Sequence, residues 1–191
     1  MGVCRMRKLG KTAGIILGMI LFIAVLQWVN QVARSAQDTA AESLTDEIVN
    51  AAPEFTVYDE ENHLVRLGQF QGSPVVIYFW ASWSRQSTKN LDAFETAYQE
   101  HGGQVQFMMI NLTDGARETV ERAQTFLRKR GYTVPVYYDR DGSASGAFAL
   151  RSIPATYFVD ENLQLIARAN GGKRTAERLE EGLAILLDGD A

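Results

Sequence analysis

The stretch from residue 75 to residue 87 reads Val-Val-Ile-Tyr-Phe-Trp-Ala-Ser-Trp-Ser-Arg-Gln-Ser, and it decides the fold. Its first six residues are apolar and largely β-branched or aromatic, which predicts a strand buried on both faces of a sheet. A helix is expected to follow from about Arg85 to Glu100, because apolar residues recur there at helical spacing. The stretch therefore predicts a central strand that turns into a helix near Trp83.

Strands and helices alternate on both sides of this stretch. Two short strands joined by a polar turn predict a hairpin, at residues 55–58 and 64–67. Further strands are expected at residues 105–110, 134–138, 152–159 and 163–167, and further helices around residues 120–130, 143–150 and 176–186. This order predicts an α/β fold, with a mixed central sheet covered by helices on both faces.

The N-terminal part of the chain carries a long apolar run, Ala13 to Leu26. With its flanks it predicts a transmembrane signal anchor at residues 12–32 and a linker at residues 33–52. A cleaved signal peptide is the alternative, but the small-residue cleavage sites lie well past the run. Residues 1–11 are predicted to be cytoplasmic and residues 53–188 to form an extracytoplasmic domain, since four basic residues precede the run: Arg5, Arg7, Lys8 and Lys11.

Charge divides along the same boundary. Residues 1–34 hold five basic residues and no acidic residue, whereas residues 35–191 hold 14 basic and 23 acidic residues. Nucleic-acid partners need a basic footprint that displaces counterions, so the outer domain is not expected to bind nucleic acid.

Three features together resemble the TlpA/ResA type of membrane-anchored thioredoxin over about residues 52–188. They are the strand-to-helix turn with Trp83, the Ile153-Pro154 step before a later strand, and the single N-terminal apolar segment. The resemblance implies a thioredoxin fold preceded by an N-terminal β-hairpin and one transmembrane helix. It also implies that Pro154 follows a cis peptide bond and that the backbone of Ile153 pairs with an extended peptide beside Trp83.

This chain departs from the family at the redox motif. The family places Trp-Cys-x-x-Cys at this turn, and Ser84 and Ser87 stand at the two cysteine positions. Thiol–disulfide exchange needs a thiolate that attacks a disulfide sulfur, which a serine hydroxyl cannot do. The only cysteine of the chain is Cys4. It precedes the apolar run, whereas the lipid-modified cysteine of a lipoprotein follows such a run, so lipid attachment at Cys4 is not expected. The chain is therefore predicted to be redox-inactive as written.

Two positions where relatives often carry an acid also differ. Tyr78 stands six residues before the first sulfur position, and Asn90 stands three residues after the second. An engineered Cys-to-Ser pair would be expected to leave at least one of the acids, so both absences favour a natural sequence without redox machinery.

Other chemistry has weaker support. A serine nucleophile would need a nearby base, but His101 lies at the far end of the predicted helix and His63 lies in the hairpin turn. Ser84 and Ser87 are instead expected to cap the helix. No cofactor is predicted. No metal site is predicted either, because the sequence has no Cys/His cluster and Asp139 and Asp141 indicate a turn. Asn111-Leu112-Thr113 matches a glycosylation acceptor, although a polar loop explains it equally well.

Two functions follow from these observations. The first is a non-catalytic module, chaperone-like or scaffolding, that binds a protein or peptide at the groove formed by Trp83, Ile153 and Pro154. The alternative is a thiol-disulfide oxidoreductase of the family, represented here by an inert Cys-to-Ser variant or acting with the cysteines of a partner.

Overall fold

The computed structural model describes residues 50–171 and 175–188, which fall within one compact unit, Leu44–Ala191. The predicted cytoplasmic segment 1–11, the predicted anchor 12–32 and most of the predicted linker 33–52 lie outside the described residues. Within residues 50–171 and 175–188, no helix is both long enough and apolar enough to cross a membrane.

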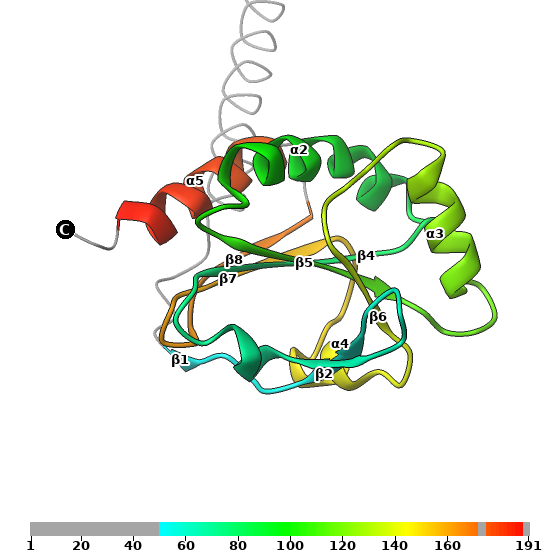
Figure 1. Cartoon of the computed structure of the whole chain (residues 1–191), viewed down its shortest axis with the longest axis horizontal. Helices are drawn as coiled ribbons and strands as arrows, with labels where there is room; N and C mark the ends of the chain where they lie inside the picture. The colour runs from blue at the N-terminus through cyan, green and yellow to red at the C-terminus, as the bar shows by residue number, and fades with distance from the viewer. Residues whose placement is uncertain (1–49, 172–174, 189–191) are drawn as a thin grey trace, which may run out of the picture. The chain divides into compact units, whose positions relative to one another are not determined.

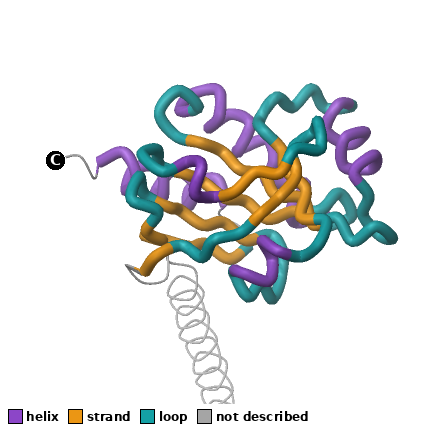
Figure 2. The backbone as a smooth tube through the Cα atoms, turned by 60° about the horizontal axis from the view of Figure 1, so that its bottom comes forward, coloured by secondary structure: helices purple, strands orange, loops and turns teal. Residues whose placement is uncertain are grey.

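A curled mixed sheet forms the centre of the domain (Figures 1 and 2). The strand order is β1-β8-β7-β4-β5-β6-β2-β3. Every residue of β4 (Val75–Trp80) is buried, as expected for a strand covered on both faces. The other strands are β1 (Asn50–Ala51), β2 (Thr56–Tyr58), β3 (Leu64–Arg66), β5 (Gln106–Leu112), β6 (Val136–Asp139), β7 (Ala155–Val159) and β8 (Gln164–Asn170). β4, β5 and β6 run parallel, and the remaining pairs are antiparallel.

Each face of the sheet has its own apolar core. Helices α2 (Arg85–His101), α3 (Val120–Arg128) and α5 (Thr175–Asp188) cover one face, where their buried residues pack on Val76, Tyr78 and Trp80. The other face is covered by the short helix α4 (Ser143–Ala147), the 3-10 turn η1 (Leu67–Phe70) and the β2–β3 hairpin. The predicted thioredoxin-like α/β fold is confirmed, although one face is covered largely by the curled hairpin rather than by long helices.

The strand register brings three connecting segments to one end of the sheet, which we call the site end. Phe79 lies opposite Ala155, and Trp80 lies opposite Asn111. The turn after β4 (residues 81–84), the segment after β5 (residues 113–119) and the loop before β7 (residues 148–154) therefore all leave or enter the sheet there.

Several element boundaries differ from the predicted ones, among them the starts of three strands. Asn50 and Ala51, placed in the linker by the sequence, pair with β8 as a short edge strand. The strand predicted from residue 152 begins only at Ala155, because Pro154 has no amide hydrogen to donate to the ladder. β6 likewise begins at Val136, after Pro135.

Candidate functional site

Ser84 starts helix α2 at the site end. Its backbone is extended, and its hydroxyl oxygen accepts a hydrogen bond from the Ser87 amide at 3.2 Å. The Ser84 carbonyl accepts the Thr88 amide, and the Ser84 amide donates back to Ala81. This is the arrangement of a helix N-cap, as predicted for Ser84.

Ser87 has a different role from the predicted one. It lies inside the first turn of α2, is fully buried, and donates its hydroxyl to the Ser84 hydroxyl oxygen at 2.8 Å. The prediction that Ser87 also caps the helix is wrong, because its side chain serves the cap residue instead of a backbone amide. The Ser84 hydroxyl oxygen thus accepts two hydrogen bonds from Ser87, one from its amide and one from its hydroxyl.

Neither hydroxyl is activated as a nucleophile. Within residues 50–171 and 175–188, no histidine or carboxylate forms a hydrogen bond with Ser84 or Ser87. His63 binds Asp59 in the hairpin turn, and His101 ends α2. A nucleophilic hydroxyl needs a base within hydrogen-bond reach, so hydrolase chemistry has no support in this geometry.

A buried phenol lies beneath the serine pair. Tyr78 is fully buried, and its hydroxyl donates to the Ser87 carbonyl at 2.9 Å. Burial raises the pKa of Tyr78 well above its usual value and outweighs the opposing effect of the polar neighbours Asn90 and Ser87. Tyr78 therefore keeps its proton at neutral pH and cannot serve as a proton acceptor. The two positions that lack an acid, 78 and 90, meet in space beneath the turn.

The loop before β7 carries the predicted cis peptide bond, between Ile153 and Pro154. The backbone of Gly171 packs against this proline, and the Gly171 amide donates to the Pro154 carbonyl at 2.8 Å. A Cβ atom on Gly171 would lie only 2.6 Å from Pro154 Cγ. This position therefore requires glycine for its close approach to the proline.

The register places this loop beside the serine turn. Because Ala155 lies opposite Phe79, Pro154 and Ile153 continue alongside the last residue of β4 and the start of the turn. Ile153 is partly buried against the core, whereas Trp83 is 42% exposed. The sequence-predicted site residues thus come from two segments that meet at the site end.

A buried carboxylate at this end was not found by sequence reasoning. Glu118 is fully buried, and its carboxylate accepts the Ser82 amide at 2.9 Å and the Ser82 hydroxyl at 2.8 Å. It also accepts the side-chain amide of Asn111 at 2.8 Å. Glu118 therefore ties the turn after β4 to the end of β5. No local signal marks it, because its partners lie seven and 36 residues away in the chain.

The hydrogen bond between Asn111 and Glu118 argues against glycosylation of Asn111 in the folded domain. Asn111 lies within β5, is fully buried, and uses its side-chain amide on Glu118. A glycan acceptor must lie on the surface. Neither the glycosylation site nor the alternative of a polar loop is correct at Asn111.

Trp83 has a cation on its ring. The guanidinium carbon of Arg117 lies 3.6 Å from the centre of the Trp83 ring, a cation–π contact. Glu118 binds Ser82 directly next to this stack. The segment after β5 therefore contacts the turn after β4 through two adjacent pairs, Arg117 with Trp83 and Glu118 with Ser82. Sequence reasoning did not predict this pairing.

The acidic groups considered for metal binding have structural partners. Asp139 accepts the amides of Ala144 and Ser145 at the start of α4, and Asp141 accepts the amide of Ser143. In the hairpin turn, ligand atoms of Asp59, Glu61 and His63 lie within 4.8 Å of one another. Asp59 is already engaged there by the amide and ring of His63, so the cluster is explained by the turn.

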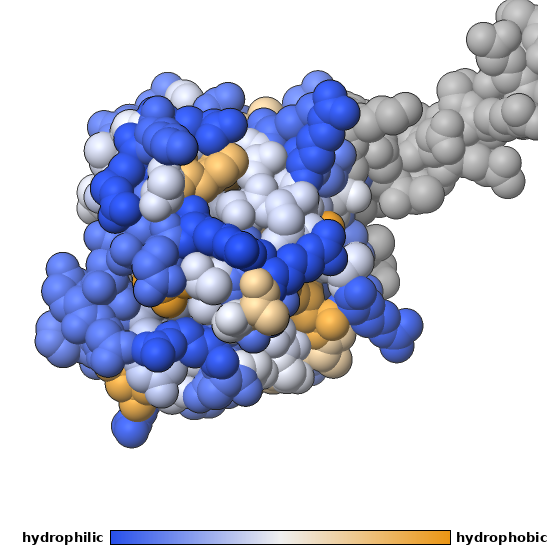
Figure 3. All heavy atoms as spheres, turned by 90° about the vertical axis from the view of Figure 1, so that its right-hand side faces the viewer, coloured by the Kyte–Doolittle hydropathy of each residue, from blue (hydrophilic) through white to orange (hydrophobic). Residues whose placement is uncertain are grey.

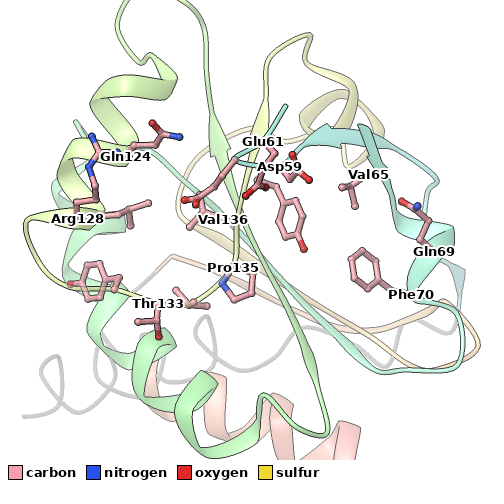
Figure 4. A pocket seen from close by; sticks show the side chains of 15 residues that line it. Asp59, Glu61, Val65, Gln69, Phe70, Gln124, Arg128, Thr133, Pro135 and Val136 are labelled. Carbon is pink, nitrogen blue, oxygen red and sulfur yellow. The ribbon is translucent and has the colours of Figure 1, made fainter. Parts of the chain in front are cut away.

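A pocket of about 700 Å³ lies away from the serine turn (Figure 4). Its walls come from the hairpin turn, η1, α3 and the residues leading into β6, and acidic Asp59 and Glu61 face it together with Arg128, Phe70 and Pro135. No residue of the turn 81–87 lines it, so it is separate from the predicted site.

Comparison with known proteins identifies the family. A model of the AhpC/TSA family matches residues 48–168, and the chain belongs to that family. The thiol-disulfide oxidoreductase ResA of Bacillus thuringiensis subsp. konkukian (strain 97-27) is 26% identical over 138 residues, which cover 72% of this chain and 77% of that protein. ResA of Geobacillus kaustophilus (strain HTA426) is 25% identical over 135 residues, covering 70% and 75%. The predicted resemblance to ResA-type proteins is confirmed.

The fold also matches a solved structure. The crystal structure of StoA from Bacillus subtilis superposes with a TM-score of 0.59 at 23% identity, covering 70% of this chain and 99% of that one. This likeness establishes the shared fold.

Proposed function

Starting from membership in that family, we propose that the chain is a thioredoxin-fold binding module that does not exchange disulfides. It holds an extended protein segment against the surface formed by Trp83 and the Ile153–Pro154 loop. The observation that carries the proposal is the 2.8 Å hydrogen bond between the Ser84 and Ser87 hydroxyls, which stands where the family motif has its dithiol.

The serine pair offers no route to the chemistry of the relatives. Exchange proceeds through a thiolate and a mixed disulfide, and an alcohol neither ionises at neutral pH nor bonds stably to sulfur. Residues 5–191 contain no cysteine, so the only thiol is that of Cys4. A single thiol cannot form a disulfide within one chain.

The surface beside the serines retains features suited to binding. Trp83 exposes 42% of its surface, and large aromatic side chains commonly anchor partners. The loop at Ile153 lies at the start of β7, where an extended segment could pair with free backbone groups, as in strand-addition modules. This supports a chaperone-like or scaffolding role.

A reductase assay tests the absence of exchange. The full chain in a neutral detergent should reduce insulin no faster than the buffer blank in the presence of dithiothreitol. The matched variant carries Ser84→Cys and Ser87→Cys together, and its activity would indicate a scaffold that lacks only the thiols. Turnover by the unmodified chain would overturn the proposal and favour the oxidoreductase alternative.

A binding assay tests the positive half of the proposal. An extended fluorescent peptide of mixed apolar and polar residues should bind the full chain and bind the Trp83→Ala variant more weakly. The Leu64→Ala variant serves as a control, because Leu64 is equally exposed but lies on the distant strand β3. Equal losses in both variants would argue against a specific role for Trp83.

The proposal places the domain outside the cytoplasm, anchored by residues 12–32. The apolar run and the preceding basic residues support this arrangement. Cys4 provides a topology test, because it is the only thiol and precedes the run. A membrane-impermeant maleimide should leave Cys4 unlabelled on intact cells and label it after lysis, and labelling of intact cells would reverse the orientation.

A further inference from the structure

Charge at the site end is opposite in sign to that of the domain as a whole. Residues 35–191 carry 14 basic and 23 acidic residues. Yet the segments 81–91, 113–118 and 149–156, which meet at the site end or continue from it, contain only two acidic residues, Asp114 and Glu118. They contain four basic residues: Arg85, Lys89, Arg117 and Arg151.

Both acidic residues are occupied by internal contacts. One carboxylate oxygen of Asp114 accepts the amides of Ala116, Arg117 and Glu118 at 2.7–2.9 Å. Glu118 is buried and bound to Ser82 and Asn111. The four basic side chains, in contrast, are exposed, and none forms a side-chain hydrogen bond or ion pair within residues 50–171 and 175–188. The site end therefore carries net positive charge, with four basic residues against two carboxylates, although the exposed Asp114 interacts electrostatically with Arg117.

Arg117 is the most constrained of these cations. Its guanidinium carbon lies 3.6 Å from the centre of the Trp83 ring, and a guanidinium carries five N–H donors in one plane. Its backbone is fixed at both ends, since the amide donates to Asp114 and the carbonyl accepts Arg122 Nη1 at 2.7 Å. A guanidinium held in this way loses less conformational entropy when it binds a ligand.

Positive charge continues along helix α3. An open depression of about 600 Å³ begins at Ser82 and is lined by Arg122, Lys129 and Arg130, with Glu121 as its single acidic residue. The face of the molecule that includes α3 is mostly hydrophilic, and its apolar areas are small and separate (Figure 3). A partner that lies on this face would therefore be recognised mainly by polar and charged contacts.

We propose that the binding surface selects an extended acidic protein segment, with one Asp or Glu carboxylate docked on the guanidinium of Arg117 where it stacks on Trp83. This inference rests on the proposed binding function and names the chemistry of its partner. Arginine is suited to the role because its planar fork binds a carboxylate through two parallel hydrogen bonds. Further acidic residues of the segment then lie along the cationic side of α3.

The test uses three fluorescent peptides of equal length, with the same apolar residues and with Asp, Asn or Lys at alternate positions. The full chain in detergent should bind the Asp peptide best and the Lys peptide worst. Arg117→Gln should reduce the preference for Asp over Asn by about three- to fivefold, the range of a partly exposed ion pair. Arg117→Lys should restore only part of it, because lysine keeps the charge without the planar fork.

Arg66→Gln is the charge-matched control, since Arg66 is exposed on the distant strand β3. It should leave the preference unchanged. Equal binding of all three peptides, weakened by Trp83→Ala, would leave the proposed function standing and overturn the acidic selection. An equal loss in Arg66→Gln and Arg117→Gln would overturn it as well, since only bulk charge would matter. Tighter binding of a short oligothymidylate than of the Asp peptide would replace the protein segment with a nucleic acid. Failure of all three peptides to bind would overturn both proposals.

Discussion

The turn after β4 and the loop before β7 meet at one end of the sheet, but different interactions hold them. In the turn, side-chain hydrogen bonds dominate: the Ser87 hydroxyl donates to Ser84, and Ser84 caps α2. In the loop, close backbone packing dominates, with Gly171 pressed against Pro154. The difference indicates that the serine pair and the neighbouring Ile153–Pro154 loop are stabilised by separate sets of contacts. One can therefore change without the other.

Removing the carboxylate of Glu118 should disturb the turn most. Glu118→Ala leaves two part-buried donors of Ser82 and one buried donor of Asn111 without their acceptor, so we expect a loss of about 3 kcal/mol in the free energy of unfolding. Urea denaturation measures it. Glu100→Ala, an exposed change on α2, is the control and should cost less than about 0.5 kcal/mol. Similar losses in both variants would show that Glu118 does not anchor the turn.

The loop should respond to a single methyl group. Gly171→Ala places a Cβ atom 2.6–2.8 Å from Pro154 Cγ, Cδ and the carbonyl oxygen, so we expect a loss of about 2 kcal/mol from overpacking. Peptide binding should weaken as the proline moves. Gly103→Ala is the matched control, because nothing lies within 4 Å of its Cβ position. A stable Gly171→Ala variant with unchanged binding would contradict the close packing.

The two serines should differ in their contribution to stability. Ser84→Ala removes the cap of α2 and leaves the buried Ser87 hydroxyl without an acceptor, for a loss of about 1–2 kcal/mol. Ser87→Ala keeps the cap and should cost less. Thermal unfolding of both single variants and the double variant gives their coupling. Equal single losses would mean that the hydroxyl pair acts as one unit.

The smallest effect should appear at alkaline pH. Burial raises the pKa of Tyr78 in the folded domain, so folding favours the protonated phenol. Its contribution to stability is complete below the unfolded pKa of about 10 and is lost as the pH rises further. Tyr78→Phe should therefore lose less stability than the wild type between neutral pH and about pH 11, measured by urea unfolding. An identical alkaline loss in both proteins would argue against this role.

Local sequence patterns were sufficient for much of the fold. The apolar run of β4 and the helical spacing after Arg85 predicted the central strand and α2, because both signals lie within one element. The cis bond at Pro154 came from the family resemblance, since local sequence alone rarely predicts it. Ser84 was identified as a cap from its type and position.

The parts that were missed depend on contacts between distant segments. Glu118 looks like an ordinary loop acid until β5 brings it beneath Ser82, 36 residues away. Arg117 contacts Trp83 for the same reason, because the segment after β5 lies next to the turn after β4. Ser87 was misassigned because a second hydroxyl near a helix start can serve either the backbone or its neighbour, and only the three-dimensional arrangement distinguishes them.

The stack of Arg117 on Trp83 also provides an optical probe. Trp80 is fully buried, whereas Trp83 is partly exposed beneath a positive charge, so the two indoles occupy very different electric fields. A carboxylate docked on the stacked guanidinium would alter the emission of Trp83 and leave that of Trp80 nearly constant. Fluorescence of the unlabelled protein, compared with a Trp83→Phe variant, would then report occupancy of the site directly.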